Sequence, residues 1–326
     1  MYERFAQAIG LLDEWGGLPR PREAKEIWDD LWHLEAHHST AIEGNTLVLR
    51  EVKSLLDDQK AVGSKEVGDY MEVLGYGEAS RWVYGQALEP EGWATEDLIS
   101  MTEVRRIHHT LMDKVWSVRP HPDAGPDEGP GSFRQHEIQA FSDGMKPPAH
   151  VQVSADLSGW WIERANALKA MTQDDSRLLS EIPEYLAQLH RDFEQIHPFI
   201  DGNGRTGRLV LNLILVRLGW PPVIILRKNR EKYLKALAKA DAGDMGPLAE
   251  QICRSVIDNL HHLIPEIAGP SRFVPLQALV DDELTYDALR QAAYRGRLEA
   301  EQTPDGSWRS SRRAVERYKS ERHQRR

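Results

Sequence analysis

The stretch HPFIDGNGRTGR, residues 197–208, stands between two segments in which apolar residues recur with helical spacing. The segment before it predicts one buried helical face, formed by Leu186, Leu189, Phe193 and Ile196. The segment after it, RLVLNLILVRLGW (208–220), is apolar on nearly every side, so we expect a central helix packed all round. The pattern predicts a mainly helical core in which one helix ends near His197 and the central helix starts near Arg205.

Two familiar phosphate-binding motifs share part of this spacing. Gly202, Gly204 and Gly207 fit G-x-G-x-x-G, but the dinucleotide fingerprint follows a strand, and here the preceding segment has helical spacing. Gly202 and Gly207 also have the spacing of the phosphate-loop glycines, yet Arg208 and Leu209 stand where that loop needs Lys and Ser or Thr. Both interpretations are excluded.

The loop has the composition of an anion site. Gly202 and Gly204 allow the backbone amides of 202–204 to point the same way, as a concave nest beside a helix N-terminus. Arg205 and Arg208 lie at i and i+3, on adjoining turns of one face, and the guanidinium fork suits phosphate oxygens.

Two further residues of the loop carry reactive groups. The carboxylate of Asp201 suits Mg²⁺, which takes one or two carboxylates together with phosphate oxygens. The imidazole of His197 can act as a base near neutral pH. Any one of these residues alone would more often cap a turn or lie on a solvated face. Together in one loop, they predict a site that handles polyphosphates.

The residues His197-Pro198-Phe199-x-Asp201-Gly202-Asn203-Gly204-Arg205-x-x-Arg208 resemble the complete signature of the Fic domain. The resemblance extends to GSFR (131–134) and REKYLKALAKADAGD (230–244), and so covers residues 95 to 265. It implies a Fic-type helical bundle with a small β-hairpin flap. It also implies transfer of AMP from ATP to a Ser, Thr or Tyr hydroxyl of a target protein.

The resemblance also implies a role for each residue of the loop. His197 deprotonates the target hydroxyl, and Asp201 holds Mg²⁺ on the α- and β-phosphates. The loop amides and Asn203 hold the phosphates, while Arg205 and Arg208 neutralise the leaving pyrophosphate. The ATP contacts implied in this way are Asp201, Gly202, Asn203, Gly204, Arg205, Thr206, Gly207, Arg208 and Tyr233.

Two implied details depend on single positions. Relatives that phosphorylate carry a lysine where this chain has Gly204, so the resemblance favours AMP transfer over phosphotransfer. Tyr233 matches a position near the nucleotide, although its spacing fits a core residue equally well. A hairpin near residues 136–148 would clamp the target segment by strand addition.

A second motif, HHSTAIEGN (37–45), lies far upstream. Ser39 and Glu43 are at i and i+4 on one helical face, and Gly44 and Asn45 suit the end of that helix. The motif resembles the family's inhibitory helix, which implies the class with an N-terminal internal inhibitor, class II. In that class Glu43 would pair with Arg208 in the place of the ATP γ-phosphate. An open alternative is that Glu43 aligns water to remove AMP.

Composition sets broader limits. The chain has 326 residues, a net charge of −10 and one cysteine, so we expect two or three domains, no internal disulfide and no coating of nucleic acid by the whole protein. The first residues show no signal-peptide pattern and the apolar runs are too short to span a bilayer, which favours a cytoplasmic protein without membrane contact.

Periodicity and turn residues predict the remaining organisation. Helices are expected at 22–43, 49–58, 66–87, 97–116, 155–173, 230–240 and 246–263. The Gly- and Pro-rich stretch 125–153 contains two strand-like pieces, 135–141 and 149–153, which predict a small hairpin. The predicted domains are an N-terminal helical region (1–92), a Fic core (93–265), a Pro-rich linker (266–275) and a C-terminal domain (276–326).

The C-terminal domain is predicted to contain a helix (284–297), two short strands around an Asp-Gly turn, and a basic helix (312–326). This order resembles a winged helix-turn-helix. Residues 305–326 carry eight Lys or Arg against three Asp or Glu, a net charge of +5. The domain could bind DNA phosphates or serve as a protein-docking or homodimer-forming appendage. The rival to an enzyme is therefore a DNA-binding regulator with a nucleotide-sensing Fic core.

Overall fold

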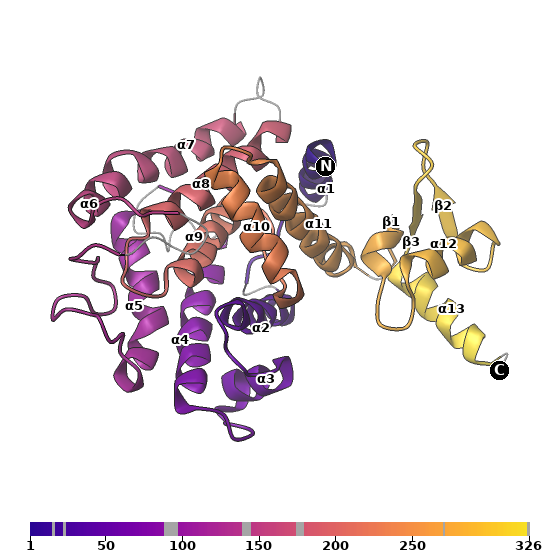
Figure 1. Ribbon diagram of the computed structural model, residues 1–326. Helices are drawn as coiled ribbons and strands as arrows, with labels where there is room; N and C mark the ends of the chain where they lie inside the picture. The colour runs from indigo at the N-terminus through magenta and orange to yellow at the C-terminus, as the bar shows by residue number, and fades with distance from the viewer. Residues whose placement is uncertain are drawn as a thin grey trace. The chain divides into compact units, whose positions relative to one another are not determined.

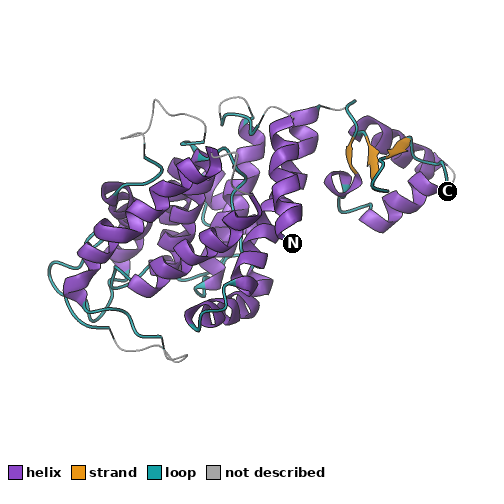
Figure 2. Cartoon of the chain, turned by 90° about the horizontal axis from the view of Figure 1, so that it is seen from above, coloured by secondary structure: helices purple, strands orange, loops and turns teal. Residues whose placement is uncertain are grey.

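The computed structural model describes residues 1–14, 17–21, 24–87, 97–138, 145–173, 179–269 and 271–324. It divides into two compact units, one of residues 1–6 and 20–256 and the other of residues 7–19 and 257–326. The first unit is built from helices and the second contains a small sheet, so the predicted mainly helical fold class is confirmed (Figures 1 and 2). None of the helices in the described part is long and apolar enough to cross a membrane.

The predicted helices are present with small shifts at their ends. In the first unit these are α2 (Lys25–Ile42), α3 (Leu49–Asp58), α4 (Val67–Tyr84), α5 (Met101–Val118), α6 (Val153–Asp156), a π-helical turn η3 (Leu157–Trp161), α7 (Ile162–Gln173), α8 (Ile182–Ile196), α9 (Asn203–Arg217) and α10 (Arg230–Asp241). Short 3₁₀ turns lie at η2 (His150–Gln152), η4 (Leu179–Glu181) and η5 (Arg227–Asn229). Two further helices, α1 (Tyr2–Glu14) and α11 (Gly246–Ala268), contribute residues to both units.

Helix α9 is the centre of the first unit. Nearly all of its residues are buried, and it packs against α2, α4, α5 and α8 (Figure 1). A helix that is apolar all round needs neighbours on every side, which is why this segment takes the central place. The helices on either side of the loop 197–202 are therefore held firmly, and the loop lies between two fixed ends.

The closest helix pair is α4 and α5, and one glycine allows it. A Cβ atom at Gly75 would lie 2.3 Å from the backbone oxygen of Leu111 and 3.3 Å from that of Thr110. The backbone of α5 cannot move aside as a flexible side chain could, so a larger residue at position 75 would push the two helices apart. The boundary predicted at residue 92 would separate these two helices, which belong to the same unit.

We expect Gly75→Ala to lower the free energy of unfolding by about 1–3 kcal/mol, as other overpacking substitutions do. Gly10→Ala is the matched control, because it lies in α1 and a Cβ there meets nothing within 4 Å. The control should be neutral or stabilising by roughly 0.5–1 kcal/mol. Urea unfolding followed by circular dichroism measures both. Equal stability of the two variants would show that α4 and α5 can accommodate a Cβ atom at position 75.

The stretch 125–153 differs from its prediction. The described residues 125–138 and 145–153 contain no strand, and the predicted strand 149–153 instead forms η2 and the start of α6. Val153 is buried together with Leu157, four residues later, while Val151 is 74% exposed. This i, i+4 burial favours helix over the alternation that suggested a strand. The middle of the predicted hairpin, residues 139–144, lies outside the described residues.

The second unit follows the predicted order of elements. It contains β1 (Val274–Pro275), a 3₁₀ turn η6 (Leu276–Leu279), α12 (Tyr286–Tyr294), β2 (Ala300–Gln302), β3 (Trp308–Ser310) and α13 (Arg312–Gln324). The strands form an antiparallel sheet in the order β1-β3-β2, in which Ser310 faces both Val274 and Ala300. Its assignment as a winged helix-turn-helix stays a prediction. Pro265 lies inside α11, which continues to Ala268, so the predicted linker overlaps a helix.

Candidate active site

The loop after α8 begins with an unusual backbone conformation at His197. This residue has φ 49°, in the left-handed region, and its N–H still donates to Phe193 O at 3.1 Å. The guanidinium of Arg134 fixes the chain at this point, because its Nε donates to His197 O at 2.8 Å. It also donates to Pro148 O at 2.6 Å. A buried arginine thus ties the loop to the segment that follows the predicted flap.

The side chain of His197 has the properties of a neutral base. Its Nδ1 lies 3.2 Å from Glu194 O, which can fix the ring orientation. Burial lowers the pKa of His197 to about 4, so the imidazole is unprotonated near neutral pH. An unprotonated ring nitrogen can accept a proton from a hydroxyl group brought into the cavity that His197 lines.

His108 on α5 supports the other end of the loop. Gly131 N–H donates to its Nδ1 at 2.8 Å, so the proton of the neutral ring lies on Nε2, 3.0 Å from Asp201 O. The ring also stacks on Phe199 with centroids 3.6 Å apart. Burial lowers the pKa of His108 to about 3, which keeps this tautomer neutral. The role of His108 in supporting the loop was not predicted from the sequence.

Hydrogen bonds between residues of the loop and of the first turn of α9 hold that turn in place. Gly202 has φ 76° and precedes the helix, while Thr206 Oγ1 donates to Gly202 O at 2.8 Å. The side-chain amide of Asn203 bonds at both ends to Phe199, accepting from its N–H at 2.9 Å and donating to its O at 2.8 Å. Asn203 therefore shapes the loop with its side chain, a different task from the phosphate contact that the resemblance implied.

Asp201 and Arg205 form one side of the site. Asp201 Oδ1 accepts from Gly202 N–H at 2.6 Å and from Arg205 Nη2 at 3.0 Å. The other end of the Arg205 guanidinium pairs with the buried carboxylate of Glu72 on α4. The side chain of Asp201 is 43% exposed. One exposed carboxylate beside a glycine-rich loop and a helix N-terminus fits Mg²⁺, which completes its coordination with phosphate oxygens and water.

Arg208 is the residue to which the upstream motif is attached. Its Nε donates to Ser39 Oγ at 2.7 Å, and its Nη2 donates to Ser39 O at 3.0 Å and to Glu43 Oε1 at 2.8 Å. The carboxylate of Glu43 lies directly over Gly204, where a Cβ would be 2.8 Å from Glu43 Oε1. The predicted pair of Glu43 and Arg208 is thus present, with Gly204 giving it space.

Two opposing effects set the charge of Glu43. Burial raises its pKa, but the coulombic attraction of Arg208 and then of Arg205 more than offsets this, and the net pKa is lowered. Glu43 is therefore ionised near neutral pH. Burial lowers the pKa of Arg208, but attraction to Glu43, Tyr233 and Tyr76 together with the hydrogen bond to Glu43 outweighs it, and the net pKa is raised. The contact is a charge-assisted hydrogen bond between two ionised groups.

A cavity of about 200 Å³ connects these groups. Its lining residues include His197, Glu43, Gly204, Arg208, Tyr233, Glu194, Met145, Leu234, Leu237 and Asp241. This volume is below the roughly 300–1,000 Å³ of common ligand pockets. Because the side chain of Glu43 extends into the cavity beside Arg208, removing it would enlarge the space at the arginine end.

Tyr233 on α10 and Glu194 on α8 also line the cavity. Tyr233 is buried and its hydroxyl lies 2.7 Å from His190 Nε2, so it is both a core residue and a cavity residue. Burial raises the pKa of Glu194 to about 7. Gly207 lets α8 approach α9 here, since a Cβ at Gly207 would lie 2.4 Å from Glu194 Oε1.

Helix α2, which carries Ser39 and Glu43, is anchored at two points before it reaches the site. Glu35 is buried and accepts from the hydroxyls of Tyr76 at 3.0 Å and Tyr84 on α4, and from Asn212 Nδ2 on α9 at 2.7 Å. Burial raises the pKa of Glu35 to about 7. The Asn212 bond attaches the middle of α2 to α9, the helix that carries Arg208, and the two tyrosine bonds attach it to α4.

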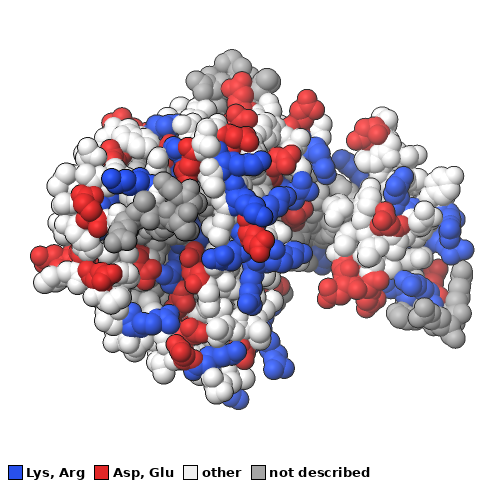
Figure 3. Space-filling view, viewed as in Figure 1, with Lys and Arg blue, Asp and Glu red and all other residues white. Residues whose placement is uncertain are grey.

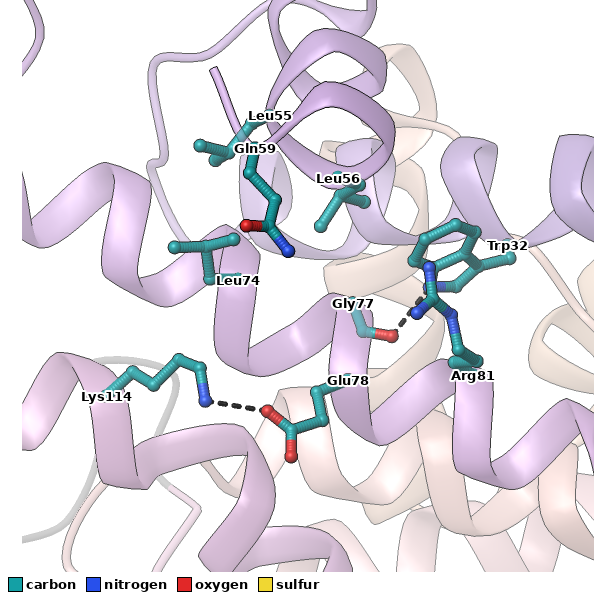
Figure 4. Close-up of a pocket in the computed structure, with 9 residues that line it drawn as sticks. All are labelled: Trp32, Leu55, Leu56, Gln59, Leu74, Gly77, Glu78, Arg81 and Lys114. Atoms are coloured by element: carbon teal, nitrogen blue, oxygen red, sulfur yellow. Dashed lines mark hydrogen bonds and ion pairs between the residues drawn. The ribbon is translucent and has the colours of Figure 1, made fainter. Parts of the chain in front are cut away.

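The second anchor of α2 lies further from the site, beside a cavity of about 550 Å³ under α3 (Figure 4). Trp32 Nε1 donates to Gly77 O at 2.6 Å, and the guanidinium of Arg81 lies over the indole ring at 4.1 Å. Lys114 pairs with Glu78 at 2.6 Å across the cavity rim. The early turns of α2 are thereby held against α4.

Residues 98–215 match the Fic/DOC family. The chain is similar to the protein adenylyltransferase Fic of Culex quinquefasciatus, with 32% identity over 245 residues that cover 74% of this chain and 43% of that protein. The match to the protein of the same name from Nematostella vectensis has 31% identity over 242 residues and covers 73% and 49% of the two chains. The chain spans about half or less of the length of these curated relatives.

Solved structures give the same result for the fold. Fic-1 (residues 134–508) from C. elegans has a TM-score of 0.64 at 26% identity, covering 82% of this chain and 72% of that chain. A Fic domain containing signaling protein from Bacteroides thetaiotaomicron has a TM-score of 0.62, covering 81% and 96%. At 22% identity this second likeness shows the fold alone.

The structure brings together the residues that the sequence singled out. His197, Gly204, Arg208, Tyr233 and Glu43 line one cavity. Asp201 and Arg205 lie beside it, while Thr206 and the side chain of Asn203 face inward and hold the loop. Glu72, His108 and Arg134 are positioning residues that sequence reasoning did not assign to the site. Of these, only Arg134 carried a signal, as part of the GSFR match.

Proposed function

We propose that the chain transfers AMP from ATP to a hydroxyl side chain of a target protein and is inhibited by its own Glu43. The observation that carries the proposal is the shared cavity, in which an unprotonated His197 and a buried Arg208 lie beside the anion-binding loop. A base, a phosphate ligand and a loop of backbone amides are the groups that nucleotidyl transfer needs. The names of the relatives support the same reaction.

In this reaction the target hydroxyl oxygen bonds to the α-phosphorus of ATP, and the bond from that phosphorus to the bridging oxygen of the β-phosphate breaks. His197 accepts the hydroxyl proton, and pyrophosphate leaves. The backbone amides at the start of α9 would hold phosphate oxygens, and Arg205 and Arg208 would balance the charge of the leaving group. Mg²⁺ held by Asp201 would supply further charge neutralisation.

The pairing of Glu43 with Arg208 provides the inhibition. While the carboxylate occupies Arg208, a phosphate group cannot use the same nitrogen atoms, and Glu43 repels the γ-phosphate. A gap of about 2.7 kcal/mol would hold such a pair closed 99 times in 100. ATP would bind productively only when Glu43 leaves.

Removal of AMP by water is a second function that one observation favours. Glu43 is ionised, and its side chain is 35% exposed in the same cavity as His197. A carboxylate in that place could accept a proton from a water molecule that attacks the phosphorus of a modified target.

The second unit gives little support to a regulator that binds DNA. In α13, Arg317 pairs with Glu299, and Lys319 pairs with Asp281 and lies 3.5 Å from Glu283. Carboxylates thus already neutralise two cations of the predicted basic surface. Binding of DNA, and a homodimer formed through this unit, stay predictions.

Labelled ATP tests the reaction directly. The Glu43→Gly chain is incubated with cell lysate and with ATP labelled on either the α- or the γ-phosphate. We expect label on protein only from the α-phosphate, because AMP transfer releases the γ-phosphate within pyrophosphate. Label from the γ-phosphate would instead show phosphotransfer. No label from either form, in a variant that binds ATP, would contradict the proposed activity.

A further inference from the structure

A second concave region adjoins the active-site cavity at the end of α2, and Ile42, Glu43 and Arg230 line both. It is a pocket of about 470 Å³, lined by Ala41, Ile42, Glu43 and Gly44 from the end of α2 and by Arg227, Lys228, Arg230 and Glu231 from η5 and the start of α10. We name it the basic pocket. In Figure 3 Lys and Arg side chains gather over α10, on a chain whose net charge is −10. The clustering of these cations on a protein of net negative charge needs a structural or functional explanation.

The three cations of the basic pocket make no ion pair with any residue in the described part of the chain. Arg227 is attached only through its backbone, whose N–H donates to His38 Nδ1 at 3.4 Å. Arg230 Nε donates to Ile42 O at 2.6 Å, in the last turn of α2. A cation at a helix C-terminus is stabilising, but Arg230 alone fills that place. The charges of Arg227 and Lys228 remain available to a ligand.

Neighbouring histidines do not add to the charge. Burial lowers the pKa of His37, and burial also lowers the pKa of His38, to about 4, with nearby Lys228 and Arg227 acting in the same direction. Both imidazoles are therefore neutral near pH 7. Of the two carboxylates in the lining, Glu43 is already paired with Arg208, which leaves Glu231 at the rim.

We propose that the basic pocket binds a small molecule carrying two or more phosphate groups, and that this binding weakens the hold of Glu43 on Arg208. Guanidinium forks and an ammonium group suit clustered phosphate oxygens, and 470 Å³ is within the usual size of a ligand site. Such an anion would draw Arg230 away from Ile42 O. It would also repel the carboxylate of Glu43. Both effects act on the last turn of α2 in the same direction.

Calorimetry with inorganic tripolyphosphate and the full chain tests the binding. Arg227→Ala with Lys228→Ala should weaken binding at least tenfold. The matched control is Lys232→Ala with Lys235→Ala, which removes two exposed cations of the adjoining helix α10 that do not line the pocket and should change affinity less than twofold. Equal losses in the two double variants would overturn the site in favour of general electrostatic attraction.

The nucleotide site also binds polyphosphates, so a second arm separates the two. In the Glu43→Gly chain saturated with a non-hydrolysable ATP analogue, tripolyphosphate should still bind with little change in affinity. Displacement by the analogue would show that the basic pocket is only an extension of the nucleotide site and would overturn the proposal.

The effect on catalysis rests on the proposed function and is measured separately. At constant free Mg²⁺, tripolyphosphate should raise AMP transfer by the unmodified chain several-fold and leave the Glu43→Gly chain unchanged. Binding to the basic pocket without this increase would overturn the link to Glu43. If no variant transfers AMP at all, the proposed function fails, while the calorimetric result on the pocket still stands.

Discussion

Replacement of Glu43 by glycine is expected to raise AMP transfer by roughly 10- to 100-fold, corresponding to a closed state favoured by about 1.4–2.7 kcal/mol. The change removes the carboxylate 2.8 Å from Arg208 Nη2 and opens the cavity at its arginine end. Arg208 then has its Nη2 available for the γ-phosphate. The measurement is the initial rate of label transfer from ATP labelled on the α-phosphate, under conditions in which the target is not exhausted.

Two further variants show whether the gain comes from this contact. Asp58→Gly is the matched control, since it replaces an exposed acid by glycine at the last residue of α3, away from the cavity. Glu43 has a similar place, directly after the last residue of α2. It should leave the rate unchanged. Arg208→Ala should not activate the chain and should cancel the gain when combined with Glu43→Gly. An Arg208→Ala chain as active as Glu43→Gly would refute the pairing mechanism.

Replacement of His197 by alanine is expected to lower AMP transfer by about 10²- to 10⁴-fold, the usual contribution of a general base. The change should be measured in the Glu43→Gly background, where the starting rate is high. ATP affinity by calorimetry should stay within a few-fold, because a base acts on the transition state and contributes little to nucleotide binding. A loss confined to the rate is the signature of this role.

His262→Ala is the control for the loss of an imidazole, because His262 is an exposed residue of α11. It should transfer AMP at the rate of its parent. Retention of full activity by His197→Ala would exclude His197 as the base. A collapse of ATP affinity in that variant would show that its effect arises from a damaged loop.

Much of the fold could be predicted because its signals are local. Leu186, Phe193 and their spacing give α8, and the apolar run after Arg208 gives α9. Pro198 follows closely on the end of α8 and Gly219 on the end of α9, and both residues act through backbone conformation. The loop residues could be assigned together because they are consecutive, so their proximity in space needed no knowledge of the fold.

The supporting contacts of the loop could not be predicted in the same way. Glu72 pairs with Arg205 across 133 positions of the chain, and His108 reaches Asp201 across 93. Nothing in the neighbouring residues distinguishes them from other acids or histidines on a helix. The free-energy cost of burying a charged group is offset by its partner. That partner can be identified only once the packing of distant helices is known.

The strand expected at 149–153 shows the limit of short patterns. Val151 and Val153 alternate as in a strand, but the apolar partner that decides the matter is Leu157, beyond the short segment. Five residues cannot distinguish a two-residue period from the first turn of a helix.

The buried contacts of Glu35 limit the ways in which α2 can move Glu43 away from Arg208. Sliding α2 as a rigid rod would strand the Glu35 carboxyl in the interior without Tyr76, Tyr84 and Asn212, a heavy penalty for a polar group deprived of its partners. Unwinding only the end beyond Ser39 leaves those bonds intact. In the proposed inhibition, the turn of α2 beyond Ser39 would therefore unwind while the rest of the helix keeps its contacts. Activation then concerns the melting of a single helical turn, which proceeds far faster than the rearrangement of a bundle.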